Sequence, residues 1–532
     1  MARGIQDDPI CDLNILKTLS WADECEECHT ACNSASPWLT SGDAVGPARL
    51  LHVGLPGQPV IKLVQTNGRR LKYVALSYCW GDKHSGRLTT NKTIGRMTTR
   101  GVSLARLSQT IQDAVEVTRR LGIAYLWVDA LCIIQEQPDK ADWIAESAKM
   151  GLIYANAYLT IAATSASSAS QGFLTRAHRL GVPVDFRVSK AGPCEGKIYF
   201  RECTEIMSSF YEDVECSSLL KRAWVKQERI LSRRTIDFSS RQIYWTCRTN
   251  RHSEDGQEDG DGAVEASAVL SSLDIFGISR SAPEQQKHMM RGLFFSSWAD
   301  LIKEYSTLQL KFESDRLPAL AGIAGILGQS VPGRYFSGIW ETSLPGGLLW
   351  EPLERPARRC PQACLPSWSW ASMVGPVSAG GPGPERARAR ARLLGTSVHE
   401  TGRQCLHLQS RLHRCRVRIS PEPPEPPCRS DRKLKDPRVE IPAYEFALDA
   451  AVGPRPLGEK FSNTCHFDGP RGTETDFYAL GLQKAPYWDG HDGLLLRKLD
   501  GAGHGTFYER VGVMSSSDRF WHALQDVSVQ LI

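Results

Sequence analysis

Three apolar runs divide the first half of the chain, and amphipathic segments separate them. The runs at 73–80, 123–132 and 158–163 are continuous rather than alternating, which is typical of strands buried on both faces. Apolar residues recur at spacings of three and four across 107–121 and 139–155, so both segments are predicted to be helices. Buried strands that alternate with helices indicate an α/β fold with a parallel sheet flanked by helices.

The pattern resumes after a looser insertion. A short helix is predicted at 222–230, and strands are predicted at 235–238 and 242–247. An acidic, glycine-rich linker then begins at Asp255. We therefore assign residues 73–250 to one α/β domain.

The second half of the chain has weaker signals. Helices are expected at 298–308 and 317–327, and extended segments at 348–350 and 366–371. Short apolar runs broken by glycines predict a mixed, mainly β C-terminal region. The predicted divisions are a Cys-containing lead-in at 1–72, the α/β domain at 73–250, a helical and extended region at 251–375, low-complexity insertions at 376–430 and a β-rich region at 431–532.

Composition narrows the class of protein. Of 532 residues, 41% are hydrophobic and 23% charged, which is ordinary for a globular protein. The net charge of +5 is too small for a surface that binds nucleic acid throughout, so no nucleic-acid partner is predicted. No stretch reaches the ~20 apolar residues of a membrane span, and the first residues lack the apolar core of a signal peptide. We expect a cytoplasmic protein with reduced cysteines.

Candidate chemistry gathers near the ends of the predicted strands. The first run closes with the segment 77–81, Ser-Tyr-Cys-Trp-Gly, and the second leads through Asp129 to Gln135. Ligands of open parallel sheets bind beyond the C-terminal ends of the strands, so these side chains are suitably placed. Plainer roles stay open: Trp80 and Trp127 could pack in the core, and backbone donors could satisfy Asp129.

A third segment, at 222–228, reads Arg-Ala-Trp-Val-Lys-Gln-Glu. On a helix Trp224 and Glu228 share one face, where an indole beside a carboxyl group can raise its pKa or position it against a ligand hydroxyl. The alternative is an ion pair of Glu228 with Arg222, Arg229 or Arg233.

In this order the three segments resemble the motifs of the fungal heterokaryon incompatibility (HET) domain family. Those motifs read Ser-Tyr-x-Trp-Gly, Trp-[Ile/Val]-Asp-[Ala/Ser]-[Leu/Ile]-Cys-Ile-x-Gln and Arg-Gly-Trp-Thr-x-Gln-Glu, and the segments 142–157 and 244–247 are also similar to the family. The third segment departs from the family at Ala223, Val225 and Lys226, where the family has Gly, Thr and an apolar residue, so any activity that needs the Thr hydroxyl would be lost. The residues that the resemblance assigns to the motifs or to a pocket are Ser77, Tyr78, Trp80, Gly81, Trp127, Asp129, Cys132, Gln135, Arg222, Trp224 and Gln227.

The resemblance implies an effector or regulator in fungal non-self recognition and programmed cell death, acting through a protein partner or through self-assembly of the domain. HET domains look like distant relatives of TIR domains, which have a Rossmann-like α/β fold. Some TIR domains cleave the nicotinamide–ribose bond of NAD with a glutamate in a Trp-x-x-x-Glu helix. By position Glu228 is its counterpart here, and Glu146, three residues after Trp143, is the second candidate.

NAD would then be a possible substrate, and no cofactor is required. A carboxylate that binds the ribose hydroxyls would stabilise positive charge at the anomeric carbon as nicotinamide leaves. A non-catalytic scaffold or accessory protein is the remaining alternative.

A separate cluster lies near the N-terminus. Cys25, Cys28, His29 and Cys32 offer zinc-type ligands within eight residues. Four ligands on one short helix cannot easily surround a tetrahedral ion, and the second ligand pair of a usual zinc finger is absent. The preferred interpretation is a cysteine-rich helix packed on the domain, so no metal is predicted and these residues stay weak candidates.

Overall fold

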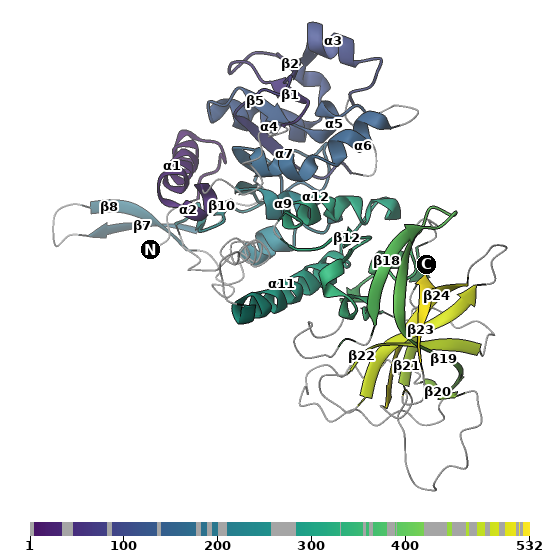
Figure 1. The fold of residues 1–532 in the computed structure, drawn as a ribbon. Helices are drawn as coiled ribbons and strands as arrows, with labels where there is room; N and C mark the ends of the chain where they lie inside the picture. The colour runs from purple at the N-terminus through teal and green to yellow at the C-terminus, as the bar shows by residue number, and fades with distance from the viewer. Residues whose placement is uncertain are drawn as a thin grey trace. The chain divides into compact units, whose positions relative to one another are not determined.

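In this computed structural model the chain divides into two compact units, each described by itself (Figure 1). The first unit comprises Met1–Ser271 and Pro318–Gln329, and the second comprises Ser272–Leu317 and Ser330–Ile532. The structure describes residues 5–33, 46–81, 88–135, 140–176, 182–188, 194–200, 210–256, 284–329, 331–354, 358–360, 365–379, 389, 391–419, 444–448, 464–467, 476–484, 490–499, 506–517, 521 and 525–532.

The first unit is built on a nine-stranded sheet. Its central strands, in the order β9-β6-β3-β5, are parallel, and the strands on both sides of them are antiparallel. Every residue of β3, β6, β9 and β10 is buried, as expected for strands covered on both faces of a sheet. In sheet order the strands are β11 (Arg251–Ser253), β10 (Ile243–Cys247), β9 (Arg234–Phe238), β6 (Leu159–Ala162), β3 (Tyr73–Ser77), β5 (Tyr125–Trp127), β1 (Arg49–His52), β2 (Val60–Gln65) and β4 (Val102–Ser103).

Helices flank this sheet, so the predicted α/β class is confirmed for a sheet that is partly parallel (Figure 1). A hairpin, β7 (Val182–Val188) and β8 (Cys194–Phe200), extends away from the sheet, and a π-helical turn covers Tyr211–Glu215. The helices of the unit are α1 (Asp12–Cys28), α2 (Thr30–Asn33), α3 (Ile94–Thr99), α4 (Gln109–Arg120), α5 (Asp129–Cys132), α6 (Ala141–Ser147), α7 (Met150–Asn156), α9 (Ala223–Leu231) and α12 (Pro318–Leu327), with a 3-10 turn at Leu104–Arg106.

Two expected elements are each divided in the structure. The apolar run 123–132 forms the short strand β5 and then the single turn α5, which begins at Asp129 after the extended residue Val128. The predicted helix 139–155 is two helices, α6 and α7. The pattern placed Ile144 and Ala155 on one face, but Ala155 in α7 is buried and Ile144 in α6 is 57% exposed.

The second unit contains the long helix α11 (Glu284–Tyr305) and a mainly antiparallel eight-stranded sheet, which confirms the predicted mainly β C-terminal region. Two of its strands occupy part of 376–430, where the sequence predicted low-complexity insertions, because apolar residues at 405, 406 and 408 are buried there. The sheet consists of β18 (Arg392–Val398), β19 (Gln404–Ile419), β20 (Tyr444–Leu448), β21 (Thr464–Phe467), β22 (Asp476–Lys484), β23 (Gly490–Leu499), β24 (Phe507–Ser517) and β25 (Asp526–Leu531).

Smaller pairs accompany this sheet. They are β12 (Tyr335–Phe336) with β13 (Ile339–Trp340), β14 (Glu351–Pro352) with β17 (Val377–Ser378), and β15 (Arg358–Arg359) with β16 (Met373–Val374). The 3-10 turns of the unit are Glu313–Asp315, Glu341–Ser343, Gly346–Leu348 and Trp370–Ser372.

The extended segments expected at 348–350 and 366–371 are wrong, because both include 3-10 or other turns. The turns let buried indoles reach backbone acceptors: Trp350 Nε1 donates to Trp368 O at 2.8 Å, and Trp370 Nε1 donates to Gly338 O at 2.9 Å. Among the described residues, no helix has the length and apolar character needed to cross a lipid bilayer.

Candidate functional site

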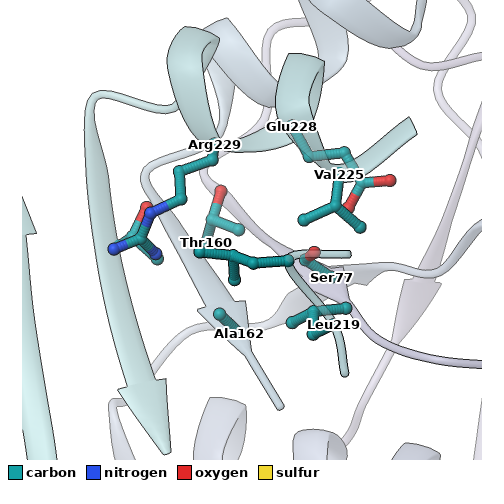
Figure 2. Close-up of a pocket in the computed structure, with 9 residues that line it drawn as sticks. Ser77, Thr160, Ala162, Leu219, Val225, Glu228 and Arg229 are labelled. Atoms are coloured by element: carbon teal, nitrogen blue, oxygen red, sulfur yellow. The ribbon is translucent and has the colours of Figure 1, made fainter. Parts of the chain in front are cut away.

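The candidate site lies where the crossovers of the parallel sheet change side. β3 lies between β5 and β6, so the chain forms β5 on one side of β3 and β6 on the other. Open parallel sheets bind ligands at such a switch point, beyond the C-terminal ends of the strands. Ser77 is the last residue of β3, and Figure 2 shows Val225 and Glu228 extending from α9 toward it.

A small pocket occupies this position. Its empty space of about 220 Å³ includes open solvent, so the enclosed room is far below the ~300–1,000 Å³ of most small-molecule sites. As it stands it admits a small group and not a whole dinucleotide. The pocket is lined by Ser77, Thr160, Ala162, Leu219, Leu220, Val225, Glu228, Arg229 and Thr235.

Glu228 is the acid of the pocket. Its side chain lies on the buried face of α9, and burial raises its pKa from 4.5 to about 7. Asp129 raises this pKa further, whereas Ser77, Arg222 and Tyr154 lower it. Among the described residues, neither Glu228 Oε2 nor the neighbouring Ser77 Oγ has a hydrogen-bond partner of normal geometry. A buried carboxyl oxygen and a buried hydroxyl are therefore both available to a ligand.

Asp129 is a second acid near Glu228, and its carboxylate accepts two hydrogen bonds. Trp80 Nε1 donates to its Oδ2 at 2.9 Å, and Ala130 N donates to its Oδ1 at 2.7 Å. Burial raises the pKa of Asp129, and the positive charge of Arg222 opposes that rise. The Arg222 guanidinium donates to the carbonyl oxygen of Tyr78, so a single cation lies near both acids. The structure thus brings the three motif segments together.

Gly81 has a backbone role in the first motif. Its φ of +82° lies in the left-handed region, and a Cβ added there would lie 2.9 Å from Ser168 Cβ. A side chain at this position would strain the backbone and would also clash with Ser168.

The second motif supports the site from behind. Trp127 is fully buried and packs edge-on against Tyr154, with ring centroids 5.5 Å apart. Burial raises the pKa of the Cys132 thiol to about 12, so this thiol stays protonated and is a poor nucleophile. Gln135 Nε2 donates to the carbonyl oxygens of Asp129 and Ile133, at 3.1 and 3.2 Å.

Two residues of the third motif make contacts that the pattern did not predict. The ring of Trp224 packs against Trp143, with centroids 6.3 Å apart, and it is not among the residues that line the pocket beside Glu228. Gln227 Oε1 accepts a hydrogen bond from Gly322 N in α12 at 2.7 Å. Both side chains hold α9 in place.

The second candidate acid, Glu146, lies outside the pocket lining. It is buried in α6, where its Oε2 accepts a hydrogen bond from Ala48 N at 3.1 Å. Its Oε1 forms an ion pair with Lys149 Nζ at 2.8 Å. Both of its oxygens therefore have partners.

Sequence reasoning missed the ion pair between Arg229 and Asp237. Arg229 was considered as a partner of Glu228, but its Nη1 lies 2.9 Å from Asp237 Oδ1 on β9. Asp237 is fully buried, and burial raises its pKa while Arg229 lowers it. An acidic residue inside an apolar strand next to a basic helix was the signal that could have predicted this pair. Tyr154 was also missed as a neighbour of Glu228, although it lies in a segment similar to the family.

The N-terminal cluster has a different membership from the predicted one. Cys25, His29 and Cys32 are buried and lie together, whereas Cys28 is exposed. The fourth member is Cys247, the last residue of β10, which sequence proximity could not indicate. These are the described residues that could hold a metal ion.

Comparison with known proteins supports the motif assignment. Residues 73–228 match the family model described as heterokaryon incompatibility protein (HET). The match runs from the start of β3 to Glu228 in α9 and so includes all three motif segments. No curated protein and no solved structure matches the chain. Residues 73–228 are therefore a HET domain, which implies a role in heterokaryon incompatibility, the non-self recognition and cell death response of fungi.

Proposed function

We propose that the HET domain is the effector of a cell-death response and that its output depends on the Glu228 pocket. The observation that carries this proposal is the buried Glu228 carboxyl, with a pKa of about 7 and an unpaired oxygen, at the switch point of the sheet. Groups with such perturbed ionisation concentrate at functional sites.

Expression in a filamentous fungus tests the effector role. The wild-type protein should arrest growth, Glu228→Gln should relieve the arrest, and Glu27→Gln, at an exposed residue, should leave it unchanged. Glu146→Gln separates the second candidate acid from the first. Normal growth at verified wild-type expression would contradict the proposal.

A second candidate function is cleavage of NAD at the same pocket, favoured by Glu228 lying beside the buried Ser77 hydroxyl. The C–N bond between ribose and nicotinamide would break, nicotinamide would leave with the electron pair, and water would add hydroxide to the anomeric carbon and release a proton. The ionised Glu228 would stabilise the oxocarbenium-like transition state, so the rate should rise as pH passes through about 7. Because the pocket is smaller than a dinucleotide, this reaction requires it to widen.

Incubation of purified protein with NAD tests the reaction. Nicotinamide release by the wild type and not by Glu228→Gln supports it, and equal release by both removes Glu228 from the chemistry. Val225 lines the pocket where the family motif has Thr, and Ala223 stands where it has Gly. The double change Ala223→Gly with Val225→Thr should alter growth arrest or turnover if the domain is an effector, and it should have no effect if the domain is a scaffold.

We also propose that the protein acts in the cytoplasm, through a protein partner or through self-assembly of the HET domain. Ten of the described cysteines, including the buried Cys79 and Cys132, are free thiols, in keeping with a reducing compartment. Light scattering of the purified protein over a range of concentrations tests the self-assembly.

A further inference from the structure

Four side chains with zinc-type ligand atoms meet in the first unit. Cys25 lies near the end of α1, His29 follows α1, Cys32 lies in α2 and Cys247 ends β10. All four are buried, and their ligand atoms lie within 4.8 Å of one another. The shortest recorded separation, Cys247 Sγ to His29 Nδ1, is 3.4 Å.

The separations between these ligand atoms are close to those around a tetrahedrally coordinated ion. With Zn–S bonds of about 2.3 Å and Zn–N bonds of about 2.0 Å, ligand atoms lie roughly 3.5 to 3.8 Å apart. The cluster reaches this geometry by contracting about 1 Å at its widest separation. Three sulfurs and one imidazole in such an arrangement favour zinc over magnesium or calcium, which prefer oxygen.

A break between α1 and α2 explains how ligands so close in the sequence can surround one tetrahedral ion. α1 ends at Cys28, His29 adopts an extended conformation with φ −97° and ψ 94°, and α2 begins at Thr30. His29 and Cys32 therefore do not lie on the same helix as Cys25. Cys247 approaches from the sheet and supplies the fourth ligand.

Surrounding donors suit sulfur ligands that carry negative charge. Thr249 N and Asn250 N donate to Cys247 Sγ at 3.4 and 3.2 Å. The buried Arg234 donates from Nε to Cys25 Sγ at 3.2 Å, so its positive charge offsets the net negative charge of three thiolates around a divalent ion.

The imidazole of His29 is oriented for the same purpose. Its Nδ1 faces Cys247, while its Nε2 lies 3.6 Å from Glu24 Oε1 and 3.2 Å from the side-chain amide of Asn250, whose oxygen can accept from Nε2–H once the amide is turned over. A carboxylate on the outer ring nitrogen is the usual support of a metal-bound histidine, because it leaves the inner nitrogen free to bind.

We propose that Cys25, His29, Cys32 and Cys247 bind one structural zinc ion that joins α1 and α2 to the end of β10. Four protein ligands leave no open position for a substrate, so the ion would stabilise the fold without taking part in a reaction. The proposal is independent of the role of Glu228.

Metal analysis of the full-length protein, purified without chelator, tests the site. We expect about one zinc per chain in the wild type and in Cys28→Ser, whose exposed thiol lies three residues from Cys25. Cys247→Ser and His29→Ala should lose most of the zinc. Loss in Cys28→Ser equal to that in Cys247→Ser would overturn the assignment, as would iron in place of zinc.

A second measurement covers variants that fail to fold. Co²⁺ added to the metal-free wild type should give the absorption of a tetrahedral thiolate site, and His29→Cys should keep metal binding with a spectrum shifted toward four sulfur ligands. Chelation should lower the Tm of the wild type but not that of Cys247→Ser. Failure of the wild type to bind either ion, or a disulfide among Cys25, Cys32 and Cys247 in the freshly purified protein, would overturn the proposal.

Discussion

The ionisation of Glu228 reflects a balance between burial and one nearby cation. Burial favours the neutral acid, and Ser77 together with the cation Arg222 favours the carboxylate, which leaves the pKa at about 7. A group with this pKa changes charge in the range where cells operate, so it can both hold a proton and act as an anion.

The stability of the folded domain should therefore depend on pH through Glu228. Between pH 4.5 and about 7 the folded protein keeps a proton on Glu228 that the unfolded chain releases, so stability falls as pH rises across this interval. The full shift corresponds to about 3 kcal/mol. Glu228→Gln should abolish this contribution, so that its stability relative to wild type is greater at pH 8 than at pH 5, as measured by urea unfolding. An unchanged difference between the two pH values would contradict the raised pKa, and Glu27→Gln serves as the control.

Arg222 sets the position of this pH interval. Arg222→Leu removes the positive charge that lowers the pKa of Glu228, so the pKa should rise above 7. In the Arg222→Leu background, the loss of stability that Glu228→Gln removes should begin at the same pH as in the wild type, because the unfolded chain sets that limit, but it should continue to a higher pH. The double-mutant cycle, measured by unfolding at several pH values, isolates this coupling. Coincident profiles in both backgrounds would show that Arg222 does not act on Glu228.

At this scale the sequence predicted that Ser77 and Asp129 lie near the same edge of the sheet, since residues near the ends of adjacent parallel strands share one edge. The strand pattern alone could not indicate that Glu228 of α9 lies beside them. It did not predict the partners of Trp224 and Arg229. Those contacts depend on where α6 and β9 pack, which helical spacing alone does not determine.

Three helices behind the site are held together by a close backbone approach. A Cβ added at Gly322 of α12 would lie 2.8 Å from the Cα of Gly151 in α7. Gln227 of α9 accepts the hydrogen bond of Gly322 N at the same place. The absence of side chains at both glycines therefore sets the distance between these helices.

Two alanine substitutions in α12 should have opposite effects. Gly322→Ala forces the helices apart and disturbs the Gln227 hydrogen bond, so we expect a loss of about 1–3 kcal/mol. Gly325→Ala, where no atom lies within 4 Å of the new Cβ, should gain about 0.5–1 kcal/mol from improved helix propensity. Chemical denaturation of both variants checks this pair, and equal effects would contradict the close contact.

The elements themselves were largely predictable, and their bounds and partners less so. The pattern predicted α4 to within about two residues at each end, because its apolar stripe is regular. It also predicted a helix at 317–327 but could not indicate that α12 packs on α7 and α9, more than eighty residues earlier. Apolar content alone could not divide 123–132 into a strand and a turn.

The first unit extends well beyond the segment that matches the HET family. Glu254 is fully buried after β11 and accepts hydrogen bonds from Asn14 Nδ2 at 3.0 Å and from Ile243 N at 3.1 Å. It also pairs with Arg176. A single carboxylate thus connects α1, the insertion and the sheet.

We therefore expect that residues 73–228 alone do not fold. This fragment contains β3, β4, β5 and β6 of the nine-stranded sheet but lacks β1 and β9, which cover the two sides of its parallel centre. Exposed edges of apolar strands aggregate readily. Near-UV circular dichroism and thermal melting of the fragment should show no cooperative transition, and a cooperative melt would contradict this expectation.

The first unit is discontinuous in sequence, since its last helix follows a segment that belongs to the second. No single recombination breakpoint between two related genes would therefore leave both units intact. A breakpoint after Ser271 would combine α7 and α9 from one parent with α12 from the other, so the hybrid would depend on the fit of Gly151 against Gly322. Inheritance of the two units is thereby linked by the path of the chain.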